Sequence, residues 1–136
     1  MNLLERTLQS LKLIHMGMLA SVVIYGILGE FVLHPQPRAL GSTALILVVI
    51  ASSMLTFGYT ARNSMVLPAE EQLRRNPNDP TLVMRWRSGV VIVMTLFEAV
   101  GLIGFVLRVL GGSPIVSILM YAISLGYLIM LGPRRP

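Results

Sequence analysis

The stretch GVVIVMTLFEAVGLIGFVL, residues 89–107, carries a single charged side chain, Glu98, near the middle of an otherwise apolar run. A bilayer is driest at this depth, and an ionised carboxylate at the centre of a membrane helix costs roughly 2.5–3.5 kcal/mol on insertion scales. Glu98 must therefore be protonated, paired, or turned toward a polar cavity. An acid in such a place is by default a functional hypothesis.

The composition of the whole chain predicts a membrane protein. Of its 136 residues, 54% are hydrophobic and only 12% are charged, against about 25% charged in soluble domains. Four stretches approach the length of about 20 apolar residues that crosses a hydrocarbon core. They are residues 13–33, 40–60, 89–110 and 114–132. We expect an all-α, four-transmembrane-helix bundle in which residues 1–136 form one integral membrane domain.

Short connections predict that the bundle consists of two antiparallel helical hairpins. Pro35 and Pro37 stop the first helix, and the next one opens at Gly41, so the first external loop is short. A tight turn, Gly-Gly-Ser-Pro at 111–114, joins the last two spans. Residues 62–88 form the one sizeable polar segment, which we expect to be a cytoplasmic loop.

Capping residues locate helix ends on the side of the membrane that carries the termini and residues 62–88. Asn2 can cap a helix that begins at Leu3, before the first span. Within the polar segment, Pro68 can begin a short helix that ends before Asn76. Asp79 followed by Pro80 is typical of an N-cap and first helical position, so the third helix should start well outside the membrane. Trp86, between two arginines, should mark where that helix enters lipid.

The basic residues are strongly asymmetric along this topology. Only Arg38 and Arg108 fall on the external side. The others share a side with both termini and residues 62–88: Arg6, Lys12, Arg62, Arg74, Arg75, Arg85, Arg87, Arg134 and Arg135. The positive-inside rule then predicts cytoplasmic termini in a bacterial-type cytoplasmic membrane. The net charge of +5 is explained by topology and anionic membrane lipid, so no nucleic-acid partner is expected.

Several kinds of chemistry have no support in the sequence. The absence of cysteine excludes disulfides, thiolate metal sites and c-type haem attachment. His15 and His34 stand near opposite ends of the first span, so they cannot share a metal; His15 is interpreted as an interfacial side chain. No nucleotide-binding loop, nucleophile elbow or pair of catalytic carboxylates occurs. We expect no enzymatic activity, no cofactor and no metal.

Glu98 belongs to one stripe of the third helix, at 100° per residue, with Met94, Gly101, Phe105 and Arg108. Gly101 allows another helix to approach closely, so lipid is an unfavourable neighbour for the carboxyl. Its candidate partners by depth are Ser21, Tyr25, Ser52, Ser53, Tyr121 and Ser124, of which we favour Ser52, Ser53 and Tyr121. The functional interpretation makes Glu98 a proton or cation carrier. The structural alternative is a protonated carboxyl that clasps two helices.

Glu30 and Arg108 each lie a few residues from the external end of a span. We expect them to form an ion pair between the first and third helices, with a structural role. The alternative is that Arg108 extends to the lipid headgroups.

The segment Glu98-Ala-Val-Gly-Leu-Ile-Gly104 resembles the carboxylate-bearing helix of the rotary ATPase proteolipids, the ring subunits of F-type and V-type machines. In that family a glutamate is followed six residues later by glycine, in a run of type E-A-x-A-I-Y-G-L. The resemblance implies that Glu98 binds the transported proton or sodium ion, in a ring that faces a stator. Glu98 and Gly104 are the two positions that carry over. The helix before the polar loop lacks the family's glycine-rich repeat.

Two functions follow as hypotheses. The first is a small proteolipid-like membrane subunit in which Glu98 supports proton or cation binding within a larger assembly or homo-oligomer. The second is a non-catalytic accessory or assembly subunit, in which Glu98, Glu30 and Arg108 are structural groups that pair helices. In that case residues 62–88 would dock a soluble partner.

Overall fold

The computed structural model describes residues 2–33 and 35–136, and all of their regular structure is helical. Five α-helices, two of them extended by π-helical turns η1 and η2, follow one another along the chain. Their bounds are α1 Leu3–Ile27, η1 Leu28–Val32, α2 Ser42–Ala61, η2 Arg62–Val66, α3 Leu67–Arg75, α4 Pro80–Val109 and α5 Pro114–Met130.

Side-chain caps fix the starts of α1 and α4, as the sequence predicts. The Asn2 side chain accepts a hydrogen bond from the Glu5 backbone N–H at 2.9 Å, and the Glu5 carboxylate accepts one from the Asn2 N–H. At the other helix, Asp79 accepts from the N–H groups of Thr81 and Leu82. These caps satisfy backbone donors that have no partner inside a helix.

Residues 62–88 are helical over most of their length, and they include the helix predicted from Pro68 and the start of the helix predicted from Pro80. Helix α2 continues through η2 into α3, so the chain stays helical without a break over residues 42–75. The short helix predicted from Pro68 is therefore the end of a long helix. Only residues 76–79 interrupt the helical structure before α4 begins at Pro80.

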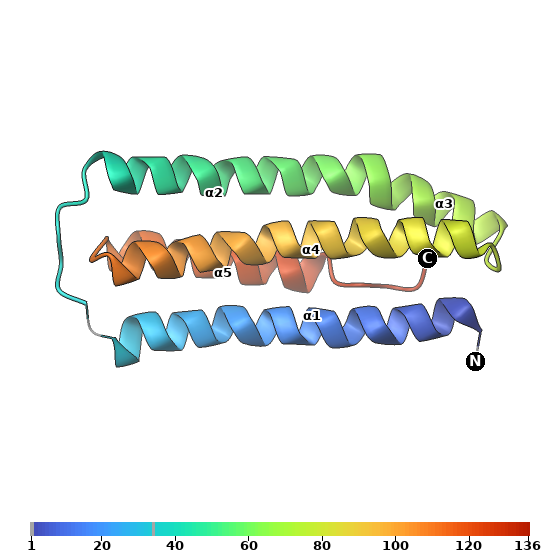
Figure 1. Cartoon of the computed structure of the whole chain (residues 1–136), viewed down its shortest axis with the longest axis horizontal. Helices are drawn as coiled ribbons and strands as arrows, with labels where there is room; N and C mark the ends of the chain where they lie inside the picture. The colour runs from blue at the N-terminus through green and yellow to red at the C-terminus, as the bar shows by residue number, and fades with distance from the viewer. Residues whose placement is uncertain (1, 34) are drawn as a thin grey trace.

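Helix α4 is the centre of the fold. Figure 1 shows it between α1 and α2, and α1, α2, α3 and α5 all pack against it. Its side chains dominate the buried core: Phe97 and Trp86 are completely buried. Phe97 stacks on Tyr127 of α5, with ring centroids 4.7 Å apart, and also lies against Gly58 of α2. The apolar run of residues 89–107 thus forms most of the surface on which the other helices pack.

The first predicted hairpin does not form. Among the described residues, α1 and α2 run antiparallel on opposite sides of α4 and do not pack as a pair. Residues 35–40 have no helical structure, and an extended chain of six residues reaches roughly 20 Å, enough to pass the end of α4. The second hairpin, α4 and α5, is closely packed around its short turn. Gly111 adopts a φ of +89° in that turn, a conformation that favours glycine.

Trp86 is buried inside the bundle and bonded to a carboxylate of α3. Its ring is fully buried between α4 and α3, and its indole N–H donates to Glu70 at 3.3 Å. Helix α3, the end of the long helix that begins with α2, covers this position. The aromatic side chain therefore belongs to the core at this level of the bundle.

Three of the helical segments are long and apolar enough to cross a membrane: Leu3–Val32, Ser42–Arg75 and Pro80–Val109. The fourth apolar helix, α5, has 17 residues, which is the lower limit of the usual range for a span. The start of α1, helix α3 and the end of the chain lie at one end of the bundle (Figure 1). The predicted basic side of the protein is this end.

Candidate functional site

Glu98 lies on the side of α4 that faces α1, where it meets one polar side chain. The Tyr25 hydroxyl donates to the Glu98 carboxyl with an oxygen–oxygen distance of 3.4 Å. Both residues are partly buried. This distance is beyond the usual 2.5–3.0 Å for such a bond, so the carboxyl is only weakly held. No other hydrogen bond to Glu98 occurs within residues 2–33 and 35–136.

Tyr25 reaches Glu98 because of the length of its side chain. Helices α1 and α4 run parallel, and Val22 of α1 lies against Gly101 of α4. By this register the backbone of Tyr25 is level with Gly104, six residues and roughly 9 Å beyond Glu98 along α4. Helix side chains tilt toward the N-terminus, so the phenol spans the difference. The depth of each residue in the membrane placed Tyr25 among six candidate partners of Glu98. Depth alone could not select Tyr25 from the six.

The structure does not bring Ser52 and Ser53 to Glu98. Their hydroxyls each donate at 2.9 Å to a backbone carbonyl one turn earlier, of Val48 and Val49. Together with Thr56 they line a shallow groove on α2, whereas α2 packs on α4 through Ala51 and Gly58. The serines therefore lie on the outer face of α2. Their hydroxyls are satisfied locally, as is common for serine in apolar helices.

Tyr121 and Ser124 of α5 also have other surroundings. Ser124 is fully buried and donates to the Phe97 carbonyl at 2.7 Å, which ties α5 to α4. The Tyr121 hydroxyl is buried and has no hydrogen-bond partner among the described residues. It lies near Gly29, in the neighbourhood of Arg108 rather than of Glu98.

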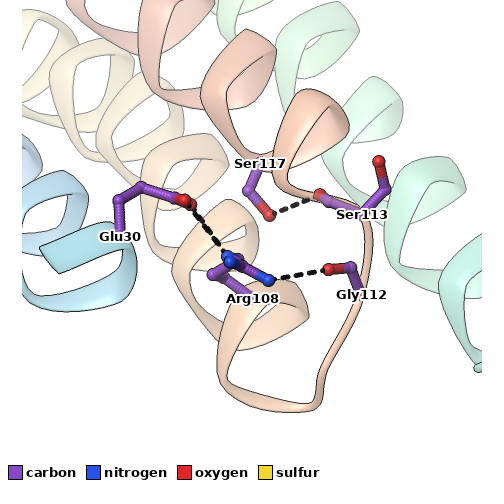
Figure 2. A network of polar contacts seen from close by, with 5 residues as sticks. All are labelled: Glu30, Arg108, Gly112, Ser113 and Ser117. Atoms are coloured by element: carbon purple, nitrogen blue, oxygen red, sulfur yellow. Dashed lines mark hydrogen bonds and ion pairs between the residues drawn. The ribbon is translucent and has the colours of Figure 1, made fainter. Parts of the chain in front are cut away.

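Glu30 and Arg108 meet at the other end of the same helix pair (Figure 2). The Arg108 Nε–H lies 3.1 Å from one carboxylate oxygen of Glu30 and 3.2 Å from the other. The two side chains are only 15% and 13% exposed, so the pair is largely removed from its surroundings. In such surroundings, removing one partner leaves a buried charge without compensation.

Arg108 also holds the turn between α4 and α5. Its Nη1 donates to the Gly112 carbonyl at 3.3 Å, as Figure 2 shows. The next carbonyl back, of Gly111, accepts from the Arg38 N–H at 2.8 Å. These contacts join three parts of the chain at one end of the bundle: η1, the connection before α2, and the last turn of α4. We name the Glu30, Arg108 and Gly112 contacts the external clasp.

An aromatic pair separates the two carboxyl groups. Tyr25 and Phe105 stack with ring centroids 5.6 Å apart and an interplanar angle of 29°. Phe105 in turn lies near Gly29, beside the external clasp. The α1–α4 contact therefore holds two acids with different partners, a guanidinium for Glu30 and a phenol for Glu98.

The remaining ionisable groups do not assemble a metal site. Within residues 2–33 and 35–136, no three histidine, aspartate or glutamate side chains are placed to hold a metal ion. The His15 Nε2–H donates to the Leu128 carbonyl at 2.6 Å, in the last turn of α5. His15 is thus an α1–α5 contact rather than a lipid-facing side chain. His34 lies outside the described residues.

The two positions that carry the proteolipid resemblance occupy different surroundings. Glu98 faces α1, whereas Gly104 lies against Met120 and Tyr121 of α5 and permits close contact between the two helices. Comparison with protein-family models, curated protein sequences and solved structures finds no significant match to this chain.

Proposed function

We propose that this chain is a small multi-pass membrane subunit in which the Glu98 carboxyl binds and releases a proton or a cation within a larger assembly. Both termini and α3 would face the cytoplasm, and α5 would form a fourth span. The short sequence resemblance to the rotary ATPase proteolipids supports an ion-binding acid at this position. The resemblance itself rests on two positions, Glu98 and the glycine six residues later, Gly104.

The observation that carries the proposal is the weak satisfaction of Glu98. A structural clasp would surround the carboxyl with donors from the neighbouring helix, because an unsatisfied polar group in an apolar region costs several kcal/mol. Glu98 has one donor, at 3.4 Å, and remains partly exposed. A carboxyl held this loosely can exchange a proton without dismantling the α1–α4 contact.

The external clasp provides the contrast within the same chain. Glu30 is held by a guanidinium at two oxygens, and Arg108 is also bonded to the turn. An acid paired in this way is held in place by its charged partner. Glu30 therefore belongs to the structural framework of the proposed subunit, and Glu98 to its activity.

Labelling by dicyclohexylcarbodiimide tests the proposal, because this reagent modifies protonated, accessible membrane carboxyls. The full chain in membranes is treated between pH 6 and 8, and modified peptides are identified by mass spectrometry. We expect modification at Glu98, with labelling that falls as pH rises.

Two controls make the result specific. Glu98→Gln should abolish labelling of that peptide, and Glu30 should stay unmodified in the native chain because it is paired with Arg108. Equal labelling of Glu30 and Glu98 would remove the distinction on which the proposal rests. No labelling of Glu98 across this range would contradict the carrier function.

A second candidate, a non-catalytic assembly subunit, is favoured by the placement of α2. This helix is attached to the bundle through one face, and α4 keeps an exposed apolar side that includes Ile92, Leu102 and Val106. A helix of a neighbouring subunit or a second copy could occupy this side. Co-purification in mild detergent tests it: a stable complex is expected, whereas a chain that always emerges alone and monomeric would contradict it.

A further inference from the structure

A pocket of about 250 Å³ lies at the end of the bundle that carries the chain termini, away from Glu98. It is enclosed by η2 and α3 on one side, by the first turns of α4 below, and by residues 130–135 on the other. Four arginines are among its lining residues: Arg62, Arg74, Arg134 and Arg135. Glu70 is the carboxylate among its lining residues.

The charges in this pocket are not balanced. Across residues 2–33 and 35–136, the carboxylates within 4.0 Å of an arginine are those of Arg75 with Glu71 and Arg108 with Glu30, both outside the pocket. Glu70 accepts the indole N–H of Trp86 instead. The pocket therefore has a formal excess of three positive charges, which is typical of a site for an anion with several oxygen acceptors.

The floor of the pocket is apolar. Four buried side chains form it: Val66, Trp86, Val90 and Val93. The arginines, in contrast, lie at the exposed rim or near it. This arrangement suits an amphiphilic ligand, whose charged group meets the arginines while the apolar part next to that group covers the floor.

Three chain segments change from apolar to basic at the level of this pocket. Helix α2 ends its apolar run at Arg62, α4 begins its apolar run after Arg87, and α5 gives way to Arg134 and Arg135. A coincident change on three helices is expected where a membrane protein passes through the lipid phosphates. The pocket thus lies where a lipid headgroup would meet it from within the bilayer.

We propose that this pocket binds the phosphate group of an anionic membrane lipid. The phosphodiester accepts hydrogen bonds from Arg62 and Arg74 on one side and from the terminal arginines on the other. Its volume accommodates a headgroup rather than a whole lipid, so the acyl chains remain in the bilayer beside the bundle. Bound lipid would connect α3 to the end of the chain.

The single tryptophan of the chain reports on this site, since Trp86 forms part of the pocket floor. The full chain in neutral detergent is titrated with phosphatidylglycerol, and with phosphatidylcholine as the net-neutral comparison. We expect a saturable change in tryptophan fluorescence with phosphatidylglycerol and no saturable change with phosphatidylcholine. Native mass spectrometry should show one retained phosphatidylglycerol.

Matched variants distinguish binding in the pocket from attraction of the lipid to general surface charge. Arg62→Gln with Arg74→Gln should weaken binding at least about tenfold, since two charge-assisted contacts are lost. Arg85→Gln with Arg87→Gln removes the same charge from exposed positions on either side of Trp86, and should leave the affinity within about twofold. Circular dichroism verifies that both proteins keep their helices.

Glu70→Gln should strengthen the binding of phosphatidylglycerol, whereas the arginine substitutions in the pocket should weaken it. The amide oxygen can still accept the Trp86 N–H, but the negative charge beside the phosphate is gone. Binding of phosphatidylglycerol should tighten about threefold by loss of this repulsion. A variant that gains affinity cannot be explained by misfolding.

Two outcomes would overturn the proposal. Equal losses in the two double arginine variants would mean that lipid follows net charge and not the pocket. Inorganic phosphate that saturates the fluorescence change with the affinity of phosphatidylglycerol would identify a site for free phosphate. If the lipid is the ligand, millimolar phosphate leaves the phosphatidylglycerol titration nearly unchanged, because it gains nothing from the apolar floor.

Discussion

The contact between α1 and α4 holds two acids, and they differ in what surrounds them. Glu30 has both carboxylate oxygens near the Arg108 Nε–H, at 3.1 and 3.2 Å, whereas Glu98 has one phenol at 3.4 Å. The first arrangement fixes the carboxylate on a charged partner. The second leaves the carboxyl with one weak contact. Two glutamates on one helix contact can therefore serve structure and chemistry separately.

Breaking the external clasp should have the largest effect. Arg108→Gln leaves Glu30 buried without a counter-charge, and we expect stability to fall by about 3 kcal/mol. The measurement is unfolding of the purified chain in detergent, followed by loss of helical signal. Glu98→Gln, which removes no ion pair, is the comparison within the same helix.

A double-mutant cycle tests whether the pair itself is responsible. Glu30→Gln should destabilise the native chain, but should have much less effect in the Arg108→Gln background, because its partner is already gone. Equal effects of Glu30→Gln in both backgrounds would show that the two side chains are uncoupled.

Adding a methyl group beside the clasp should have the next largest effect. In Gly29→Ala the new Cβ would lie 2.8 Å from the Tyr121 hydroxyl, so the ring or the helix must shift. We expect a loss of about 2 kcal/mol by overpacking. Gly26→Ala is the matched control one turn earlier, where the nearest atom would be 3.6 Å away. There alanine should be neutral or stabilising, by up to about 1 kcal/mol.

The two tyrosine hydroxyls give a smaller contrast. Tyr25→Phe removes the hydrogen bond to Glu98 but keeps the stacking on Phe105, and should cost about 1 kcal/mol or less. Tyr121→Phe removes a buried hydroxyl that has no partner in the described structure, and should not lower stability. If both variants lose stability equally, the Tyr25 hydroxyl does not contribute a specific contact to Glu98.

Replacing Glu98 should have the smallest effect on stability. Glu98→Gln keeps an acceptor for Tyr25 and removes an ionisable group from an apolar region, so unfolding should change by less than about 0.5 kcal/mol. A large destabilisation would instead favour the structural clasp.

The sequence predicted the helix ends more reliably than the helix neighbours. Asn2, Asp79 and Pro80 signal backbone caps, whose chemistry is local, and the structure places α1 and α4 where these residues indicate. The sequence carries a weaker signal of which face of a membrane helix is buried, because lipid-facing and protein-facing side chains are both apolar. Neither the position of α2 nor the choice among six hydroxyls near Glu98 could be derived from depth alone.

The basic pocket is a second feature that local sequence patterns could not predict. Trp86 flanked by arginines fits a membrane-surface anchor equally well as a buried residue, and only the path of α3 decides between them. The continuation of α2 into α3 brings Glu70 onto the indole and Arg62 to the pocket. Long-range placement of this kind depends on packing and not on local pattern.

Infrared difference spectroscopy of the carboxyl groups tests the distinction between the two acids most directly. The native chain, Glu98→Gln and Glu30→Gln are titrated in lipid membranes, and the carbonyl band of protonated carboxyl groups is followed. We predict a band that decreases as pH rises in the native chain and in Glu30→Gln, and that is missing in Glu98→Gln. A band that persists in Glu98→Gln, or that never changes with pH, would contradict a proton-exchanging Glu98.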